Sequence, residues 1–201
     1  MNKMKVLLPG LLLAGACASA GVPFEQRPLA CVMPFTYSAS DQQYASSVTG
    51  LQDSLTASLM KTAKIRLVER ARVDAALAEL KLASSGLVDS NTAAQVGKLI
   101  GAKYAVLGSV TALSVTDESR SVLIAAKTDR NVAVSAEARL INLETGELLG
   151  AGKAVGEAKS SEKHAFGAKA GTLAKADGII QLAIMDLSDD LAEDLVSNLG
   201  K

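Results

Sequence analysis

Residues 65–111 constrain the fold of this chain more than any other part of the sequence. They open with an alternating segment, residues 65–68, that predicts a short strand. An apolar stripe at helical spacing follows, and it predicts an amphipathic helix that buries Val73, Ala76, Leu77 and Leu80. Residues 104–110 are almost wholly apolar, as expected of a strand that is covered on both faces. The stretch therefore predicts helices layered against a sheet.

A second helix is predicted between Gly86 and Gly101. Asp89, Ser90 or Asn91 can cap its first turn, because short polar side chains accept hydrogen bonds from the free backbone N–H groups there. Its buried face is predicted to consist of Ala93, Val96, Leu99 and Ile100. Gly101 occupies the position after the helix where a left-handed backbone is expected.

The segments before this stretch add one strand and one helix. Residues 29–35 are apolar and predict a core strand that ends near Pro34. The helix that follows the polar 36–44 loop is predicted to bury Val48, Leu51, Leu55 and Leu59.

From residue 112 onward the pattern changes to antiparallel strands. One face of a strand is formed by Val132, Val134, Ala136, Ala138 and Leu140, and the other by Ser135, Glu137 and Arg139. Residues 142–147 predict a hairpin turn with Gly146 at its tip, and residues 148–157 predict the return strand. Residues 159–178 are polar and rich in glycine and alanine, so we predict a crossing segment there.

A long helix is predicted over residues 179–199. It would bury Ile180, Ile184, Leu187, Leu191 and Leu195. Its outer side would carry Asp186, Asp189, Asp190, Glu193 and Asp194. The order of elements predicts an α/β (α+β layered) fold: a mixed sheet of about five strands, with helices mainly on one face and a C-terminal helix.

Composition excludes several classes of function. The chain has 21 basic and 21 acidic residues, and it contains no basic run of the kind that binds phosphate backbones. Nucleic acid is therefore not an expected partner. Aromatic residues make up 3% of the chain and Trp is absent, which disfavours a sugar-binding groove or an aromatic belt at a membrane.

Residues 1–20 are predicted to be a signal peptide. Lys3 and Lys5 precede a short apolar core, which is too short to span a bilayer. Residues 13–17 (LAGAC) resemble a bacterial lipobox, so that Cys17 would become the lipidated first residue. Alternatively, cleavage after Ala20 would release a soluble protein. Residues 21–28 are predicted to form a tether and residues 29–201 a single periplasmic domain.

No residue pattern predicts catalysis, a metal site or a cofactor. Cys31 lies within an apolar strand and is predicted to be a core residue without a disulfide partner. His164 is the only histidine, so it is predicted to be a surface residue and not a metal ligand. Gly150, Gly152 and Gly156 are spaced somewhat like a dinucleotide-binding sequence but precede no helix, and they predict a flexible strand end. The sequence therefore does not predict an enzyme.

The 36–44 loop is the candidate contact surface. Tyr37 and Tyr44 are two of only three tyrosines in the chain, and exposed aromatic residues on a loop are typical of binding surfaces. Ser40, with Gln43 three positions later, could form a capping box for the next helix. The alternative is that both tyrosines simply pack against that helix.

The sequence also resembles the curli secretion channel family, a group of CsgG-like outer-membrane lipoproteins. The resemblance lies in residues 67–70 (LVER), 77–80, 97, 99–104 (LIGAKY), 108–110 (GSV) and 141–148 (INLETGEL), in that order. It implies a periplasmic domain anchored to outer-membrane lipid through an acyl chain, assembled as a homo-oligomeric ring that exports curli subunits. In that family a constriction loop follows the first strand. Tyr37, Ser40, Asp41, Gln42 and Tyr44 would belong to its counterpart here.

Two segments depart from the family pattern. Membrane-spanning strands need apolar residues at alternate positions, but residues 115–131 carry six charged residues and residues 159–178 carry several lysines. We therefore expect incomplete pore hairpins. The favoured hypothesis is a CsgG-like lipoprotein that acts in curli-type export or envelope assembly by binding proteins. The alternatives are an activator of a cell-wall synthase (a penicillin-binding protein) and a ring-forming secretion channel.

Overall fold

The computed structural model describes residues 22–80, 89–166 and 168–199. Within these residues seven strands form one mixed sheet in the order β3-β1-β4-β5-β6-β7, with β2 also paired to β4. The strands are β1 (Leu29–Val32), β2 (Thr36–Tyr37), β3 (Arg66–Leu67), β4 (Tyr104–Val122), β5 (Ala125–Asn142), β6 (Leu148–Ala165) and β7 (Ala168–Ala170). The predicted α/β class is confirmed, and the two strands beyond the predicted number are the short β2 and β7.

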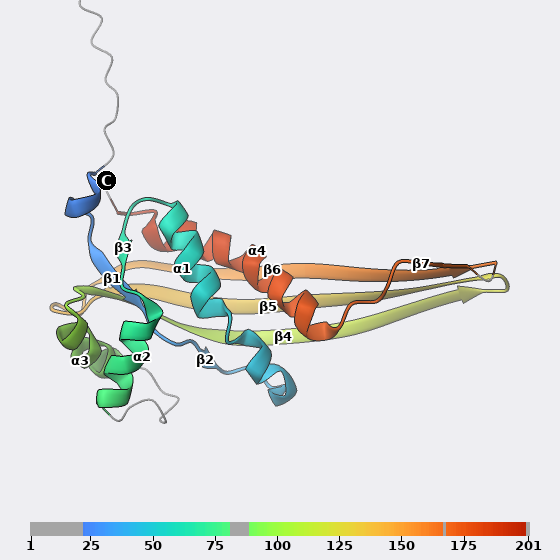
Figure 1. The fold of residues 1–201 in the computed structure, drawn as a ribbon, viewed down its shortest axis with the longest axis horizontal. Coiled ribbons are helices and arrows are strands. Elements are labelled where there is room, and N and C mark those ends of the chain that lie inside the picture. Colours follow the sequence, from blue (N-terminus) through green and yellow to red (C-terminus); the bar gives the residue numbers. More distant parts are fainter. Residues whose placement is uncertain (1–21, 81–88, 167, 200–201) are drawn as a thin grey trace, which may run out of the picture.

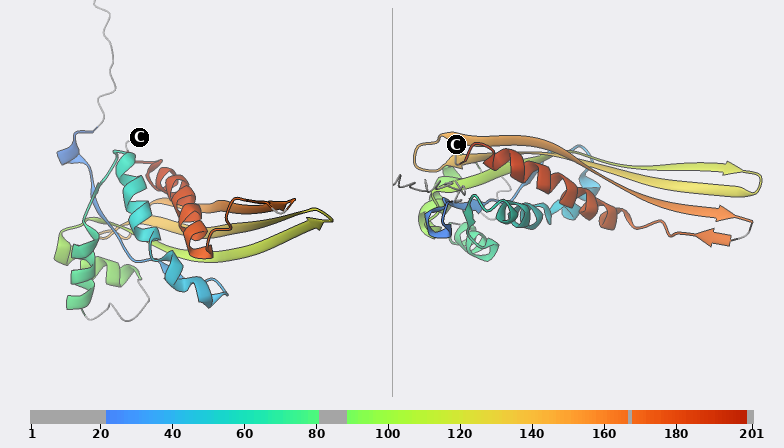
Figure 2. Two further views of the ribbon diagram at one scale, coloured as in Figure 1. Left: turned by 45° about the vertical axis from the view of Figure 1, so that its right-hand side comes forward. Right: turned by 90° about the horizontal axis from the view of Figure 1, so that it is seen from above.

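The helices pack on both faces of the sheet. They are the 3-10 helices η1 (Phe24–Gln26) and η2 (Gln42–Val48) and the α-helices α1 (Leu51–Lys61), α2 (Arg70–Glu79), α3 (Ser90–Ile100) and α4 (Ala176–Val196). On the face with the larger core, α4 covers β5 and β6, and α1 lies beside α4 over β1 and β3, so the helices over this part of the sheet lie on one face, as predicted (Figures 1 and 2). The smaller pair, α2 and α3, packs on the other face beside β1 and the start of β4.

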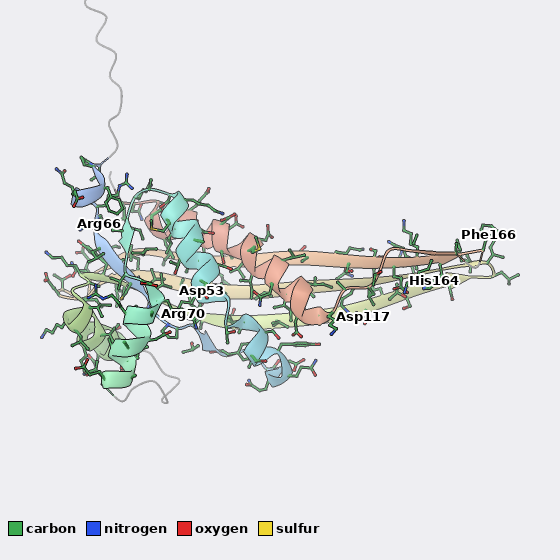
Figure 3. The ribbon with its side chains drawn as sticks, in the orientation of Figure 1. Asp53, Arg66, Arg70, Asp117, His164 and Phe166 are labelled. Atoms are coloured by element: carbon green, nitrogen blue, oxygen red, sulfur yellow. The ribbon has the colours of Figure 1, made fainter. Side chains whose placement is uncertain are left out.

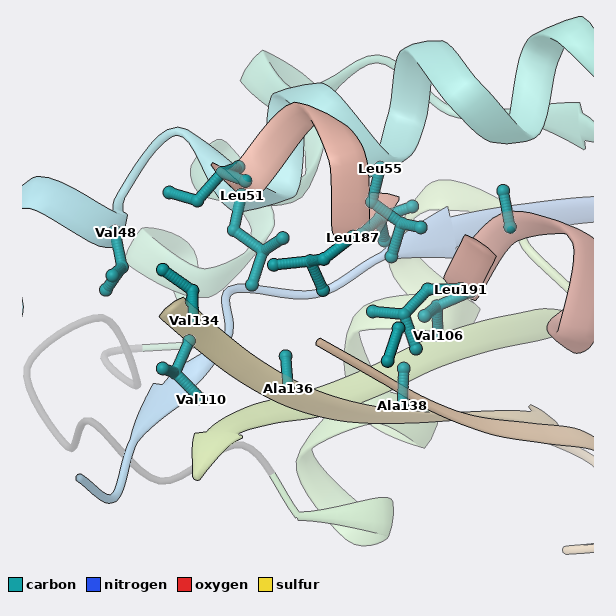
Figure 4. Packing of buried hydrophobic residues seen from close by; sticks show 14 of the residues in the cluster. Val48, Leu51, Leu55, Val106, Val110, Val134, Ala136, Ala138, Leu187 and Leu191 are labelled. Carbon is teal, nitrogen blue, oxygen red and sulfur yellow. The ribbon is translucent and has the colours of Figure 1, made fainter. Parts of the chain in front are cut away.

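The larger core lies between α1, α4 and the sheet. Leu51 and Leu55 of α1 meet Leu187 and Leu191 of α4 above the small side chains of β5 (Figure 4). The inward residues of α4 that the sequence predicted are all fully buried. Because each buried leucine removes a large apolar surface from water, this layer supplies much of the driving force for folding.

The smaller core confirms most of the predicted 65–111 unit. Val73, Ala76 and Leu77 of α2 pack against Ala93, Val96 and Ile100 of α3, against Cys31 of β1 and against Met33, which directly follows β1. Asp89 caps α3 by accepting a hydrogen bond from the Thr92 backbone N–H at 2.8 Å, and Gly101 adopts the expected left-handed backbone at φ 75°. Leu99 was wrongly placed on the buried face; it is exposed, and Gly97 lies inward instead.

Three glycines of β6 allow α4 to approach the sheet closely. A β-carbon on Gly150 would lie 2.1 Å from the Leu195 carbonyl oxygen, and one on Gly156 would lie 1.9 Å from the Ala183 carbonyl oxygen. A β-carbon on Gly152 would lie 2.6 Å from the Asp194 Cβ. The prediction of a flexible strand end is therefore wrong. These glycines lie within β6, where the missing side chains make room for α4.

The strands β4, β5 and β6 continue beyond the helices as a projecting arm, which comprises residues 116–131, residues 159–165 and β7 (Figures 1 and 2). The predicted crossing over residues 159–178 is therefore wrong in its first half, because residues 159–165 extend β6 and β7 folds back along it. Apolar residues alternate along a strand only where one of its faces packs against a core. Residues 159–165 pair with the backbone of β5 but face no core, so their sequence shows no such alternation.

Candidate functional site

The 36–44 loop is fixed to the body of the protein at both ends. Thr36 and Tyr37 form β2, which pairs with Ser109 and Val110 of β4. At the other end, the Ser47 hydroxyl donates to the Asp177 carboxylate at 2.6 Å, which ties η2 to the first turn of α4. The segment is therefore partly strand and partly 3-10 helix, and not an irregular loop throughout as predicted.

The predicted contact residues differ in exposure. Ser40, Asp41 and Gln42 are exposed, whereas Tyr37 and Tyr44 are half-buried against the larger core, which agrees with the alternative that both tyrosines pack inward. The Tyr37 hydroxyl donates to the Asp41 carbonyl oxygen. Partial burial, with a further contribution from the Asp41 charge, raises the pKa of Tyr37 above its ordinary value. The tyrosines thus support the loop, which presents mainly polar side chains.

Asp41, not Ser40, caps the helix that follows. The Asp41 Oδ1 atom accepts a hydrogen bond from the Gln43 backbone N–H at 3.1 Å, so the predicted capping box of Ser40 and Gln43 does not form. Gln42 donates to the Ala39 carbonyl oxygen at 2.9 Å. Ser40 is left exposed between these two contacts, on a backbone held by its neighbours.

A hollow in the sheet lies next to this loop. It has a volume of about 540 Å³ and is open to solvent on the sheet face away from α4. Thr36 at the start of the loop lines one side. The charged residues at its wall are Glu137, Arg139 and Lys153. The hollow and the loop adjoin at Thr36, and their exposed charged and polar side chains suit contact with another protein.

Ion pairs, in place of a core, hold the arm together on both of its faces. On one face Arg130 binds both carboxylate oxygens of Asp117, at 2.7 and 2.6 Å, and donates to the Ala174 carbonyl oxygen at 3.0 Å. On the other face Asp129 lies 2.7 Å from the Lys127 ammonium and 3.2 Å from that of Lys159. Sequence patterns missed the Asp117–Arg130 and Asp129–Lys159 pairs, because their partners come together only in the register of the long strands.

Glu162 joins β6 to β7 and to the segment that leads into α4. Its carboxylate lies 2.8 Å from the Lys169 ammonium and 2.6 Å from the His164 ring, and it accepts from the Leu173 backbone N–H at 3.1 Å (His164 is labelled in Figure 3). These contacts, the one with Lys169 above all, lower the pKa of Glu162 to about 2. Contacts with Lys127, Ser161 and Lys159 likewise hold the pKa of Asp129 well below its usual range.

The arm is therefore expected to loosen in acid. Both carboxyl pKa values are depressed in the folded state, so their stabilisation is present above the ordinary pKa of about 4 and is lost as the pH falls toward 2. Amide protection factors in β6 and β7, measured by hydrogen exchange and corrected for intrinsic rates, should fall across this range while those of α4 change less. A double variant, Asp129→Asn with Glu162→Gln, should show low protection at every pH. Constant protection of the wild-type arm down to pH 2.5 would contradict this account.

The remaining candidate residues have structural explanations. Cys31 is fully buried, and burial raises the pKa of its thiol to about 12, so it is a core residue as predicted. His164 is exposed as predicted and contacts Glu162. On the outer side of α4, Asp189 lies 3.1 Å from the Lys61 ammonium, which links α4 to α1. Cys17 lies outside the described residues.

Among the helices of the described residues, none is both long enough and apolar enough to cross a bilayer. In the same ranges no three His, Cys, Asp or Glu side chains gather as they would around a metal ion.

Comparisons with known proteins give a family and a set of distant folds. Residues 21–199 match the family described as "Curli production assembly/transport component CsgG". No curated protein matches the chain. The chain is similar to the C-terminal domain of LpoB from Salmonella enterica, at 19% identity over 64% of this chain and 81% of that one, with a TM-score of 0.46. It is similar to lipoprotein GNA1162 from Neisseria meningitidis, at 21% identity over 63% and 78%, with a TM-score of 0.45. It is also similar to the PelC dodecamer from Paraburkholderia phytofirmans, at 10% identity over 82% and 89%, with a TM-score of 0.35.

Proposed function

The chain belongs to the CsgG family, and from that premise we propose that it is a periplasmic lipoprotein at the outer membrane that acts in curli-type export or envelope assembly by binding other proteins. The observation that carries the proposal is the family match, which extends over residues 21–199. The lipobox-like sequence that ends in Cys17 supports an acyl anchor.

Binding, and not catalysis, accounts best for the surface. The 36–44 loop offers exposed polar groups on a fixed backbone, and the adjacent hollow is wide and open. The buried thiol of Cys31 is a poor nucleophile, because a thiol whose pKa is about 12 carries almost no thiolate at neutral pH. The partners are envelope proteins, either components of curli-type export or a cell-wall synthase.

The arm favours an adaptor over a channel. A strand that crosses a bilayer presents an apolar face to lipid. The arm instead carries the Asp117–Arg130 pair on one face and the Asp129 cluster on the other. Placing such charges in hydrocarbon is costly. Although the hairpins are long, the charges on both of their faces support the hypothesis that they do not form complete pore hairpins.

One preparation of the mature protein tests this proposal. Its intact mass should correspond to a chain that begins at an acylated Cys17, and the same sample should give no ion conductance in planar bilayers. If a cell-wall synthase is the partner, a synthase added to the same sample should bind the protein, or the rate of the synthase should change.

Three results would each overturn part of the proposal. An unmodified N-terminus at Gly21 would remove the acyl anchor. Conductance steps in the bilayer would favour the ring-forming channel. A specific effect on a synthase, without any effect on curli-type export in cells, would favour the activator.

A further inference from the structure

The far end of the arm exposes a compact group of apolar side chains. The exposed fractions are 72% for Val122, 105% for Leu123, 58% for Ile124 and 83% for Phe166, and we call these four residues the apolar tip. The β4–β5 turn and the end of β6 meet there, because the Phe166 backbone N–H donates to the Ile124 carbonyl oxygen at 3.1 Å. Figure 3 shows Phe166 at this extremity, far from both cores. Apolar side chains gathered at one exposed point usually mark a contact surface.

The backbone conformation at the apolar tip is one that usually selects residues other than large apolar ones. Leu123 and Ile124 are the two residues between the last paired positions of β4 and β5, where Asn and Gly are the usual choices. Phe166 has a positive φ of 51°, a conformation that is costly for a bulky side chain. Turn chemistry therefore does not account for the apolar residues, and exposure of this kind points to a function.

Three cations lie directly behind the tip. Arg120, Lys127 and Lys163 face one another across β4, β5 and β6. Like charges at directly opposed positions destabilise a sheet unless an anion compensates them. Glu118 and Asp129 reach the first two, at 3.4 and 2.7 Å. Between the three cations is a hollow of about 290 Å³ with small alanine side chains in its lining.

The spacing of the two groups fits one kind of surface. Arg120 precedes Val122 by two residues, so along a strand the cations lie roughly 7 Å behind the tip. An apolar group that enters a bilayer interface sinks about 5–10 Å, which would bring these cations level with the lipid phosphates. The carboxylates of Asp129 and Glu162 lie one or two residues behind these cations, and moving such charged groups into hydrocarbon is costly, so they would oppose deeper entry.

We propose that the apolar tip inserts shallowly into the surface of an anionic phospholipid bilayer, with Arg120, Lys127 and Lys163 bound to lipid phosphates. This contact is separate from the proposed acyl anchor at Cys17 and from the protein-binding surface beside the 36–44 loop. It would hold the arm against a membrane while the rest of the arm stays in water.

The absence of tryptophan from the chain permits a direct test. Leu123→Trp places a single fluorophore at the tip. With vesicles that contain phosphatidylglycerol, its emission should shift to the blue, and lipids brominated in the upper acyl chain should quench it. Leu148→Trp is the matched control, because Leu148 is 58% exposed at the other end of β6 and its emission should not change. The comparison holds whether or not the chain is acylated, because an anchor would bring both positions to the vesicle.

A charge variant tests the role of the cations. Each basic residue near an anionic surface contributes about fivefold to binding, so Arg120→Gln with Lys163→Gln should weaken the response of Leu123→Trp by about 25-fold. The weaker binding would be measured as a larger fraction of anionic lipid needed for the half-maximal blue shift of the Trp emission. Lys98→Gln with Lys103→Gln removes the same charge from the body and should have little effect.

Three outcomes would overturn the proposal. The first is no shift of Leu123→Trp with any vesicle. The second is an equal shift with neutral and anionic vesicles, which would remove the cations from the account. The third is an emission already blue-shifted without lipid that reverts on dilution, which would show that a second copy of the chain covers the tip.

Discussion

Replacing Gly156 with alanine is expected to destabilise the fold by about 3 kcal/mol, at the upper end of the range for overpacked cores. The new β-carbon would lie 1.9 Å from the Ala183 carbonyl oxygen and 2.8 Å from the backbone nitrogen of Leu187. Both contacts are with the backbone of α4, which cannot rotate away as a side chain can. The helix would have to lift from β6, and the larger core would lose contacts along its length.

The matched control is Gly178→Ala. Gly178 lies in α4 with nothing within 4 Å of the position where a β-carbon would be, so alanine there should stabilise the helix by about 0.5–1 kcal/mol. Urea denaturation should give midpoints that move in opposite directions for the two variants, with similar slopes. A Gly156→Ala midpoint equal to that of the wild type would show that α4 does not pack on β6 as described.

The sequence predicts the parts of this fold that face a core. Apolar periodicity located the α1 and α4 faces, the alternation of β5 and most of the 65–111 unit, because burial imposes those patterns directly. The arm carries no such pattern, since its strands are held by backbone pairing and by ion pairs such as Asp117–Arg130. The glycines of β6 were misinterpreted for a related reason. Whether a glycine means flexibility or close packing depends on what lies opposite it, which a sequence does not contain.

The structure gives the residues of the 36–44 loop roles that differ in part from the predicted ones. Ser40 and Asp41 are both good capping residues, and only the path of the backbone decides that Asp41 caps η2. For Tyr37 and Tyr44 the sequence leaves two predictions open, a contact surface or packing against the helix, and in the structure both rings pack against the core. The sequence does not predict that the apolar tip is exposed, because the pattern of apolar residues alone does not distinguish a turn from the end of a buried strand.

Because the geometry of the 36–44 loop is fixed, we expect a crosslinker at position 40 to give a high yield of product with any protein that binds the loop. Ser40 is exposed, and its neighbours are held by β2, by the Asp41 cap and by the hydrogen bond from Gln42 to Ala39. A photoreactive amino acid at this position should therefore leave the fold intact and lie against whatever binds the loop. The same amino acid at Leu148, which is also exposed but lies at the far end of β6, is the control.

Photo-crosslinking from position 40 in intact cells tests the central claim, that this chain works by binding envelope proteins through the surface beside its loop. The account predicts a discrete crosslinked product that contains an envelope protein, identified by mass spectrometry, with at least tenfold less product from position 148. Products made only of two copies of this chain, or equal yields from the two positions, would contradict it.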